Sequence, residues 1–248
     1  MRKYACTLAI FACLVSFTTD AKYHNMIKVP SGKYKTHDGK IVDVASFYID
    51  KYEFTIGEFK RFVDATQYIT TAEKEGGSTI MGGDYVKGVN WRCDAKGEKI
   101  TVDYNDKPVL YLSYSDVKAY CDWSGKRFLS EIEWDYAFRE AKDSKFKYSG
   151  SNRGQNVAVN DNFDDNVQGP KNVGTKQPNA LGIYDMSGNV NEICMVDSKT
   201  LVLKGGGVID PISVLSYVMR RVAALNETHN WYIGYRLACG VEELKVKN

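Results

Sequence analysis

The chain has 248 residues, of which 33 are Lys or Arg and 31 are Asp or Glu, so its formal net charge is +2. Hydrophobic residues make up 44% and charged residues 26%, values typical of a folded globular protein and not of a disordered or collagen-like chain. This balance provides no concentrated basic surface, and we therefore expect no nucleic-acid partner.

The first 21 residues predict a secretory signal peptide. Arg2 and Lys3 precede an uncharged apolar run from Tyr4 to Phe17, and the polar stretch ending at Ala21 resembles a cleavage region. The run is too short to cross about 30 Å of hydrocarbon, so the mature chain is expected to have no transmembrane segment. We expect a secreted or periplasmic protein, with lipid attachment at Cys13 as the alternative.

The rest of the chain is predicted to form one domain over residues 26–243, followed by a charged tail at 244–248. Residues 44–52 have strand character, being rich in β-branched and aromatic side chains. Helices are predicted over three segments that begin at a Ser or Thr: Thr55 to Thr66, Ser115 to Ser124 and Ser130 to Ala141. Glu58 and Glu133 lie three residues after the first and third of these starts, the spacing of a capping box.

From residue 150 to residue 188 the chain is rich in Asn, Asp, Gly and Pro, which predicts a long irregular segment. A loop of that length in a compact domain is typical of a functional or ligand-holding segment. Short strands are predicted at 201–203, 220–224 and 231–238. Early helices followed by loops and strands predict an α+β fold with an antiparallel sheet.

Several segments together resemble the formylglycine-generating enzyme, or sulfatase-modifying factor, family. They are MIKVPSGKY (26–34), FYIDKYEFTIGEFKRFV (47–63), KPVLYLSYSDVKAYCDWSGKRFLSEIEWDYA (107–137), NALGIYDMSGNVNE (179–192), KGGG (204–207) and IGYRLA (233–238). They occur in the family's order and cover nearly the whole mature chain. The resemblance implies a C-type-lectin-like α+β fold with a short antiparallel sheet, two or three helices and much irregular structure.

Enzymes of this family oxidise a sulfatase cysteine with O₂ and a copper(I) ion that two cysteines hold. The corresponding interval here, residues 205–236, contains no cysteine. Asp210, Leu215 and Tyr217 fall near the expected positions, and copper(I) selects soft thiolate ligands that none of them supplies. Copper and the oxidase reaction are therefore not expected. An oxidase acting on a protein cysteine through a relocated metal site, for example at Cys194, is the alternative.

The resemblance also indicates where a ligand would bind. The loops 191–197 and 207–221 correspond to the family's substrate pocket, where Gly207 stands for the motif serine and Asn191 for the usual tryptophan. Besides these two and Asp210, we expect Tyr217, Arg220 and Arg221 to line the pocket and to bind a protein or glycan ligand. A purely structural envelope subunit is a third hypothesis.

Two oxygen-rich loops are candidates for structural calcium, which takes carboxylate and carbonyl ligands. By resemblance, the first site uses the side chains of Asp185 and Glu192 and the carbonyls of Gly188 and Val190. The second uses the side chains of Asn160 and Asp165 and the carbonyls of Asp161 and Val167. A polar loop without a metal is the alternative for each.

Four cysteines follow the signal segment: Cys93, Cys121, Cys194 and Cys239. None has the CxxC spacing of a zinc site, so disulfides or buried thiols are expected. The resemblance implies a disulfide between Cys121 and Cys239, and the state of the other two is left open. The histidines, His24, His37 and His229, are expected to be surface or loop residues. Packing is the favoured role of Trp91 and Trp231, with sugar stacking as the alternative.

Overall fold

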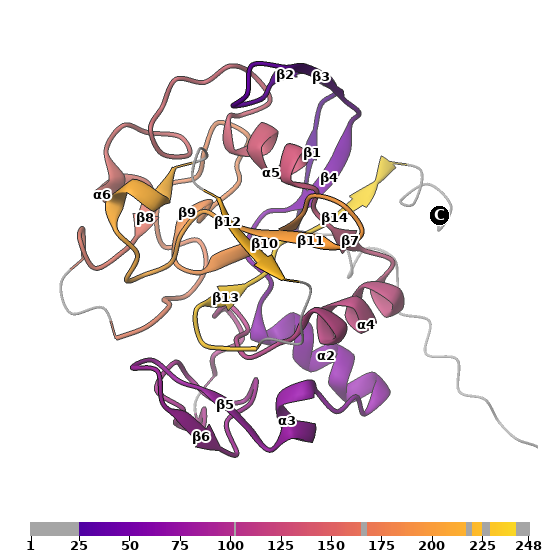
Figure 1. Ribbon diagram of the computed structural model, residues 1–248, viewed down its shortest axis with the longest axis vertical. Coiled ribbons are helices and arrows are strands. Elements are labelled where there is room, and N and C mark those ends of the chain that lie inside the picture. The colour runs from indigo at the N-terminus through magenta and orange to yellow at the C-terminus, as the bar shows by residue number, and fades with distance from the viewer. Residues whose placement is uncertain (1–24, 102, 165–167, 217–219, 225–228, 242–248) are drawn as a thin grey trace, which may run out of the picture.

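Two four-stranded sheets organise the fold, shown in Figure 1 by a computed structural model that describes residues 25–101, 103–164, 168–216, 220–224 and 229–241. The first sheet joins β1 (Met26–Val29), β4 (Phe47–Asp50), β14 (Leu237–Gly240) and β7 (Arg127–Phe128), and its neighbours are all antiparallel. Since β1 and β14 both pair with β4, the two ends of the domain lie in one sheet.

The second sheet joins β12 (Arg221–Ala224), β11 (Thr200–Lys204), β10 (Asn191–Met195) and β13 (Ile233–Gly234). Its pairs are antiparallel except that β13 runs parallel to β10. Three two-stranded pairs complete the β structure: β2 (Gly32–Lys35) with β3 (Ile41–Val44), β5 (Gly77–Thr79) with β6 (Tyr85–Lys87), and β8 (Ala158–Val159) with β9 (Ser187–Gly188).

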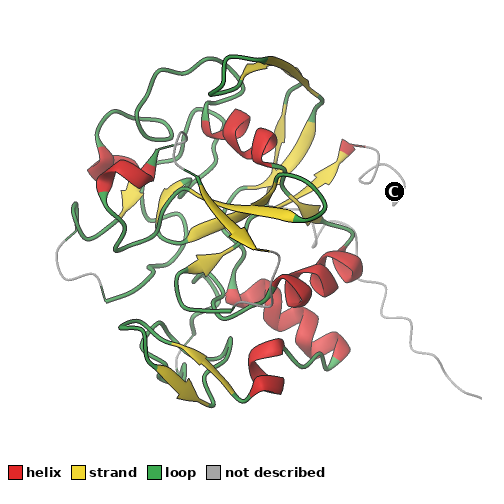
Figure 2. Cartoon of the chain, viewed as in Figure 1, coloured by secondary structure: helices red, strands yellow, loops and turns green. Residues whose placement is uncertain are grey.

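The longer helices are α2 (Ile56–Thr66), α4 (Tyr114–Ser124) and α5 (Glu131–Phe138). In Figure 2, α2 and α4 lie together at one end of the molecule, and α5 lies on the other side of the sheets. Short helices occur at α3 (Thr71–Glu75), α6 (Gly154–Val157) and the 3₁₀ turn η1 (Ile212–Leu215). The α+β class with short antiparallel sheets agrees with the prediction.

The helix starts follow the local sequence closely. Thr55 and Ser130 are N-caps with complete capping boxes, as predicted, because each hydroxyl accepts from the backbone of the Glu three residues on. The second helix starts one residue earlier than predicted, since Ser113 and Asp116 form its box. The third ends at Phe138 instead of Ala141, because Glu140 and Ala141 have φ +64° and +54° and lie outside the helical region.

The predicted strands divide more finely in the structure. The expected strand at 44–52 contains β4 and only the last residue of β3, with two irregular residues between them. The expected strand at 231–238 is divided between β13 and the start of β14. β10 was not predicted, although all but its last residue are buried. Irregular backbone covers most of the described part of 150–188, in agreement with the sequence, and the helices and strands among those described residues are α6, β8 and β9.

Strand β14 separates the two largest hydrophobic clusters. Leu237 packs with the aromatic side chains of α2 and α4, whereas the adjacent Ala238 packs with Phe47 of β4 and Trp134 of α5. Alternation along a strand produces this division, since successive side chains point to opposite faces. The first sheet is therefore buried on both faces at β14, which fixes the position of Arg236 just before it.

Some predictions fall outside the described residues: the signal peptide at 1–21, the tail at 244–248, Asp165, Val167 and Tyr217. Within the described ranges, none of the helices has both the length and the apolar character required to traverse a bilayer.

Candidate functional site: a buried polar network and an adjoining cavity

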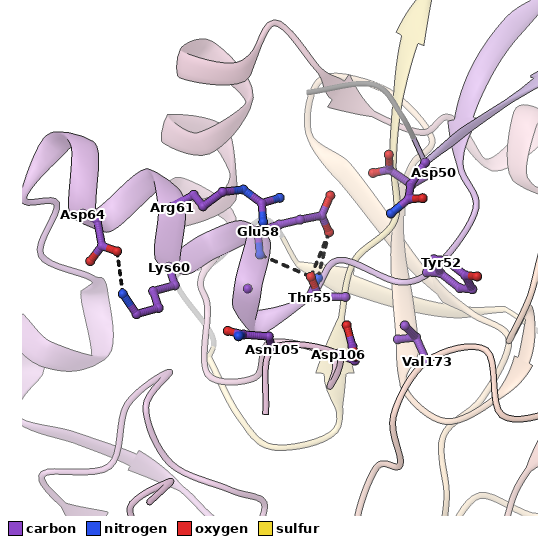
Figure 3. A pocket seen from close by; sticks show the side chains of 12 residues that line it. Asp50, Tyr52, Thr55, Glu58, Lys60, Arg61, Asp64, Asn105, Asp106 and Val173 are labelled. Carbon is purple, nitrogen blue, oxygen red and sulfur yellow. Dashed lines mark hydrogen bonds and ion pairs between the residues drawn. The ribbon is translucent and has the colours of Figure 1, made fainter. Parts of the chain in front are cut away.

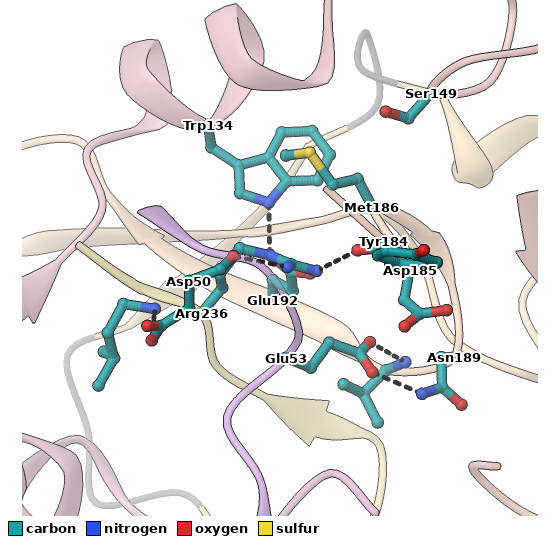
Figure 4. A network of polar contacts seen from close by, with 12 residues as sticks. Asp50, Glu53, Trp134, Ser149, Tyr184, Asp185, Met186, Asn189, Glu192 and Arg236 are labelled. Carbon is teal, nitrogen blue, oxygen red and sulfur yellow. Dashed lines mark hydrogen bonds and ion pairs between the residues drawn. The ribbon is translucent and has the colours of Figure 1, made fainter. Parts of the chain in front are cut away.

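A fully buried arginine organises the polar centre of the domain (Figure 4). Arg236 donates to Glu192 through Nε at 3.1 Å and Nη2 at 2.7 Å. Its remaining donors reach the carbonyls of Asp50 and Tyr184 at 3.0 and 2.7 Å. Trp134 Nε1 donates to Glu192 Oε2 at 2.6 Å. Both carboxylate oxygens of Glu192, a residue of the first predicted calcium site, therefore already have protein donors.

Asp185, the other carboxylate of that predicted site, is only half satisfied. Its Oδ2 accepts from the Gly174 backbone N–H at 2.6 Å, whereas its buried Oδ1 has no hydrogen-bond partner among the described residues. Burial, together with the negative charge of Glu192, raises the pKa of Asp185 to about 6. The residue also has φ +58°, a conformation that Asp tolerates better than most residues. Asp185 Oδ1 is thus an available oxygen ligand in a buried position.

Glu53 is a third buried carboxyl group of this network, and the sequence analysis missed it. Its Oε1 accepts from the Val190 backbone N–H at 3.1 Å, and its Oε2 accepts from the Asn189 side-chain amide. Burial and the neighbouring Asp185 and Glu192 charges raise its pKa well above the usual range. Three carboxyl groups therefore share one guanidinium, that of Arg236. The negative charge that Arg236 does not balance must be neutralised by a bound cation or by protons.

The loop between Asp185 and Glu192 brings Gly188 and Val190 into the same buried region. Nowhere in the described ranges do three or more His, Cys, Asp or Glu side chains gather closely enough to hold a metal ion. A cation here would therefore depend on Asp185 Oδ1 and backbone carbonyls, as the resemblance implies, and not on a cluster of side chains.

In the second predicted calcium loop, the Asn160 side chain hydrogen-bonds to the 207–210 segment. Its side-chain amide donates to the carbonyls of Gly207 and Asp210 at 2.9 and 3.0 Å, and its Oδ1 accepts from the Asn162 N–H at 3.0 Å. The latter contact is an Asx-turn. The backbone of Asp161 donates to the Val208 carbonyl, and its side chain is exposed. Asn160 thus ties this loop to the 207–210 segment.

Two of the positions near the family's copper cysteines, Asp210 and Leu215, have structural roles here. Asp210 Oδ1 pairs with Arg221 Nη2 at 2.7 Å, and its Oδ2 accepts from the Asn191 amide at 2.8 Å and the Gly207 N–H at 2.7 Å. Leu215 is fully buried in a small cluster with Tyr148, Val157 and Ala158. Neither residue presents a soft ligand.

Four of the six predicted pocket residues line one cavity of about 490 Å³: Asn191, Gly207, Asp210 and Arg221. The other lining residues are Gly82, Gly83, Asn189, Val208, Ile209, Trp231 and Tyr232. Arg220 is not among them, because it pairs with Glu131 at 2.8 Å. The charges of Asp210 and Arg221 balance each other in this cavity, and Val208, Ile209, Trp231 and Tyr232 supply its apolar side chains.

A side chain at position 207 would crowd the Asn191 amide. A Cβ atom at this position would lie 3.0 Å from Asn191 Nδ2, closer than ordinary van der Waals contact. The glycine and Asn191, which stand where the family has serine and tryptophan, are therefore sterically coupled.

The predicted disulfide between Cys121 and Cys239 is not formed, and this expectation is corrected here. All four cysteines of the described chain are buried without a disulfide. Alternation on β14 places Cys239 on the face of Leu237, which packs in the cluster of Cys121, so the expected face is retained. The Cys239 thiol is instead directed to Met26 Sδ, 3.6 Å away.

The remaining candidates serve packing or local structure. Cys194 is fully buried, and burial raises its thiol pKa well above the usual range, which disfavours the thiolate that a metal needs. Trp91 and Trp231 are both buried, in agreement with packing. His37 is exposed, and His229 lies in a loop as expected, although it is buried there and contacts Ser78 Oγ at 2.8 Å and Glu75 Oε2 at 3.0 Å. His24 lies outside the described residues.

The chain is similar to known proteins over most of its length. The sequence profile of the sulfatase-modifying factor enzyme 1-like domain matches residues 14–241. The formylglycine-generating enzyme of Mus musculus is 31% identical over 210 residues, which span 67% of this chain and 56% of that enzyme. The inactive C-alpha-formylglycine-generating enzyme 2 of Bos taurus is 26% identical over 265 residues, or 87% of this chain and 88% of that protein. The solved structure of PvdO from Pseudomonas aeruginosa has the same fold, with a TM-score of 0.67 at 22% identity, covering 87% of this chain and 94% of that chain.

Proposed function

From the premise that this chain belongs to the sulfatase-modifying factor family, we propose that it is a non-catalytic, calcium-stabilised binding module. The profile match and the relatives support membership of the family, and one of those relatives is named as inactive. The proposal is that the domain keeps the family's scaffold and uses the former substrate cavity to hold a segment of another protein.

The observation that carries the proposal is the pair Asp210 and Leu215. Asp210 is committed to Arg221, Asn191 and the Gly207 backbone, and Leu215 is core. A hard carboxylate locked in an ion pair and an aliphatic side chain cannot bind copper(I), which requires soft sulfur ligands. The residues present therefore do not fit the metal of the family's oxidases.

Calcium fits better. Among the described residues, the buried carboxylate oxygen Asp185 Oδ1 has no hydrogen-bond partner, and this region has more carboxyl groups than cations. Bound calcium would neutralise this excess and connect Asp185 with the carbonyls of Gly188 and Val190. Glu192, already bonded to Arg236 and Trp134, would contribute only if it gave up one of these donors.

The 490 Å³ cavity is suited to a peptide segment in an extended conformation. Trp231, Tyr232 and Ile209 offer apolar surface, and Ile209 is 52% exposed. Arg221 retains donors beyond the two that Nη2 uses, and these can bind neutral carbonyl groups of a peptide. A protein of this kind would act outside the cytoplasm, which agrees with the predicted signal peptide.

Catalysis is tested with the purified mature protein, copper(I), O₂ and a cysteine peptide of the sulfatase type. We expect no formylglycine by mass spectrometry, with an active family enzyme as the positive control. Stoichiometric copper uptake together with turnover would overturn the proposal.

Peptide binding is tested by selection from a displayed peptide library, followed by titration of the selected peptides. Ile209→Asp should weaken their binding at least tenfold, whereas Ile69→Asp, at a position 58% exposed and outside this cavity, should not. If the parent, Ile209→Asp and Ile69→Asp bind the peptides equally, the peptides bind elsewhere and this cavity is not the binding site. If the protein binds glycans on a parallel array and selects no peptides, the ligand is a glycan and the peptide proposal is wrong.

A further inference from the structure

The structure contains a second and larger cavity, of about 610 Å³, beside the start of α2 (Figure 3). Its polar wall comes from α2, from the segment that leads into it and from the loop at 105–106. The lining residues are Asn25, Asp50, Tyr52, Thr55, Gly57, Glu58, Lys60, Arg61, Asp64, Asn105, Asp106 and Val173. None of them lines the cavity of the proposed function, so the two sites are independent.

The inner wall of this polar cavity carries excess negative charge. Lys126 is buried and lies 2.7 Å from Asp50 Oδ1 and 3.3 Å from Glu58 Oε1. Asp50 and Glu58 line the cavity and Lys126 does not, so the two carboxylates lie between the ammonium group and the open space. One cation therefore balances two anions, and burial raises the pKa of Asp50 to about 6.

Each of these carboxylates can accept more hydrogen bonds than it does. Asp50 accepts from Lys126 and from the Leu237 N–H at 3.3 Å, and Glu58 accepts from Lys126 and from Thr55. An ionised carboxylate has about four acceptor positions. Acceptor capacity for a cationic donor therefore remains at this wall.

A cation of the same helix, Arg61, also lines this cavity. Arg61 follows Glu58 by three residues, so the two lie on one face of α2, and Figure 3 shows both at the cavity. No hydrogen bond or ion pair engages the Arg61 side chain within the described ranges, whereas the neighbouring Lys60 pairs with Asp64. Asn105 and Asp106 likewise have side chains without a recorded partner in that part of the chain.

We propose that this cavity binds a small zwitterion, an amino acid or short peptide with free termini. Its ammonium group would be held by Asp50, Glu58 and Asp106, and its carboxylate by Arg61. Such a ligand would balance the charges on both sides of the cavity. Its ammonium group supplies the positive charge that Asp50 and Glu58 lack, and its carboxylate fits the guanidinium group of Arg61. The volume lies within the roughly 300–1,000 Å³ typical of small-molecule sites.

The test uses isothermal titration calorimetry of the mature protein with L-alanyl-L-alanine at pH 7.5. N-acetylation of the dipeptide removes its ammonium charge and should weaken binding at least tenfold. C-amidation removes its carboxylate and should also weaken binding, though not in the variant Arg61→Gln. No binding of the unmodified dipeptide at millimolar concentration overturns the proposal.

The variants separate a binding role from a structural one. Arg61→Gln should lower the affinity for the dipeptide about tenfold and leave the melting temperature unchanged, because this side chain is exposed and makes no hydrogen bond or ion pair with the described part of the chain. Arg153→Gln, an exposed arginine outside the cavity, is the matched control and should bind as the parent does. Equal affinity of the parent and Arg61→Gln, or equal binding of the dipeptide and its amide, contradicts the assignment of the carboxylate to Arg61.

Discussion

Arg221 Nη2 lies 2.7 Å from Asp210 Oδ1, and the same nitrogen lies 3.0 Å from Asn191 Oδ1. Since Asn191 also donates to Asp210 Oδ2, the three side chains form a closed ring of polar contacts at the cavity wall. This ring holds β12, β10 and the 207–210 loop together at the cavity wall.

Removal of Asp210 should loosen this wall. In Asp210→Ala, Asn191, Arg221 and the Gly207 N–H lose their acceptor, and we expect a loss of about 1–3 kcal/mol in the free energy of unfolding. Urea denaturation measures this loss. Asp43→Ala, which breaks an exposed ion pair with Lys33, should cost less than 1 kcal/mol. Equal costs for the two variants would show that the ring contributes nothing beyond a surface pair.

Substitution in the Glu192–Arg236 pair should destabilise the fold more than loss of the Asp210 ring. Glu192→Gln keeps the size of the side chain but removes the carboxylate that pairs directly with the fully buried guanidinium. We expect a destabilisation of about 3–5 kcal/mol by chemical denaturation. The same change at exposed Glu98 serves as the control and should be nearly neutral. A loss below 1 kcal/mol at Glu192 would mean that water replaces the pair.

The raised pKa of Asp185 predicts how stability depends on pH without metal. The folded-state pKa of about 6 lies above the ordinary 3.8, so the folded chain holds this proton more tightly than the unfolded chain does. The contribution of Asp185 to stability therefore falls as pH rises from about 4 to about 6 and is level above that. In Asp185→Asn this fall disappears, and the calcium-free variant should be more stable than the parent at pH 7 by about 1–3 kcal/mol.

Denaturant titrations at pH 4.5 and pH 7 check this expectation. Asn is the suitable replacement because it has nearly the same shape and tolerates the left-handed backbone conformation of this position. If Asp185→Asn destabilises the calcium-free protein equally at both pH values, the carboxyl group has another partner.

Calcium should reverse the sign of that effect. The parent protein is expected to gain about 2.7 kcal/mol of stability at a calcium concentration 100 times the Kd, and Asp185→Asn should gain almost nothing. Melting curves with calcium and with a chelator measure the gain, and elemental mass spectrometry gives the stoichiometry. Asp161→Asn, in the second candidate loop, should keep the gain, because its exposed side chain is not an expected ligand. Identical melting temperatures with and without calcium would remove the first site.

The thiols give an independent check of the packing. Burial raises the pKa of Cys121 to about 12 and that of Cys194 well above its usual range, so neither is reactive as a thiolate at neutral pH. We expect negligible labelling by a thiol reagent in the native protein and four labelled cysteines after denaturation without reductant. Two labelled cysteines would indicate a disulfide in the purified protein.

The sequence predicted best those features that depend on neighbouring residues. Thr55 with Glu58 and Ser130 with Glu133 form capping boxes because both partners lie within one helical turn. Thr70 with Glu73 carries the same signal for α3, which was overlooked because that helix is only five residues long. The irregular 150–188 segment was also predicted, since its composition alone disfavours regular structure.

The interior of the site could not be predicted in this way, because its contacts join distant parts of the chain. Glu53 accepts from Asn189 and Val190, more than 130 residues later, so nothing near Glu53 marks it as part of the site. Glu192 fits a calcium ligand by motif, but only the folded chain shows that Arg236 and Trp134 already occupy it. The motif identifies Glu192, whereas the partners that balance its charge are brought to it only by the fold.

The contact between Asn191 and the position of Gly207 constrains how this domain could change over its history. A serine at 207 would place Cβ 3.0 Å from Asn191 Nδ2, so the amide must be replaced or must move before a side chain at 207 can be accommodated. Positions 191 and 207 are therefore expected to change together and not one at a time, because each limits the side chain that the other can carry.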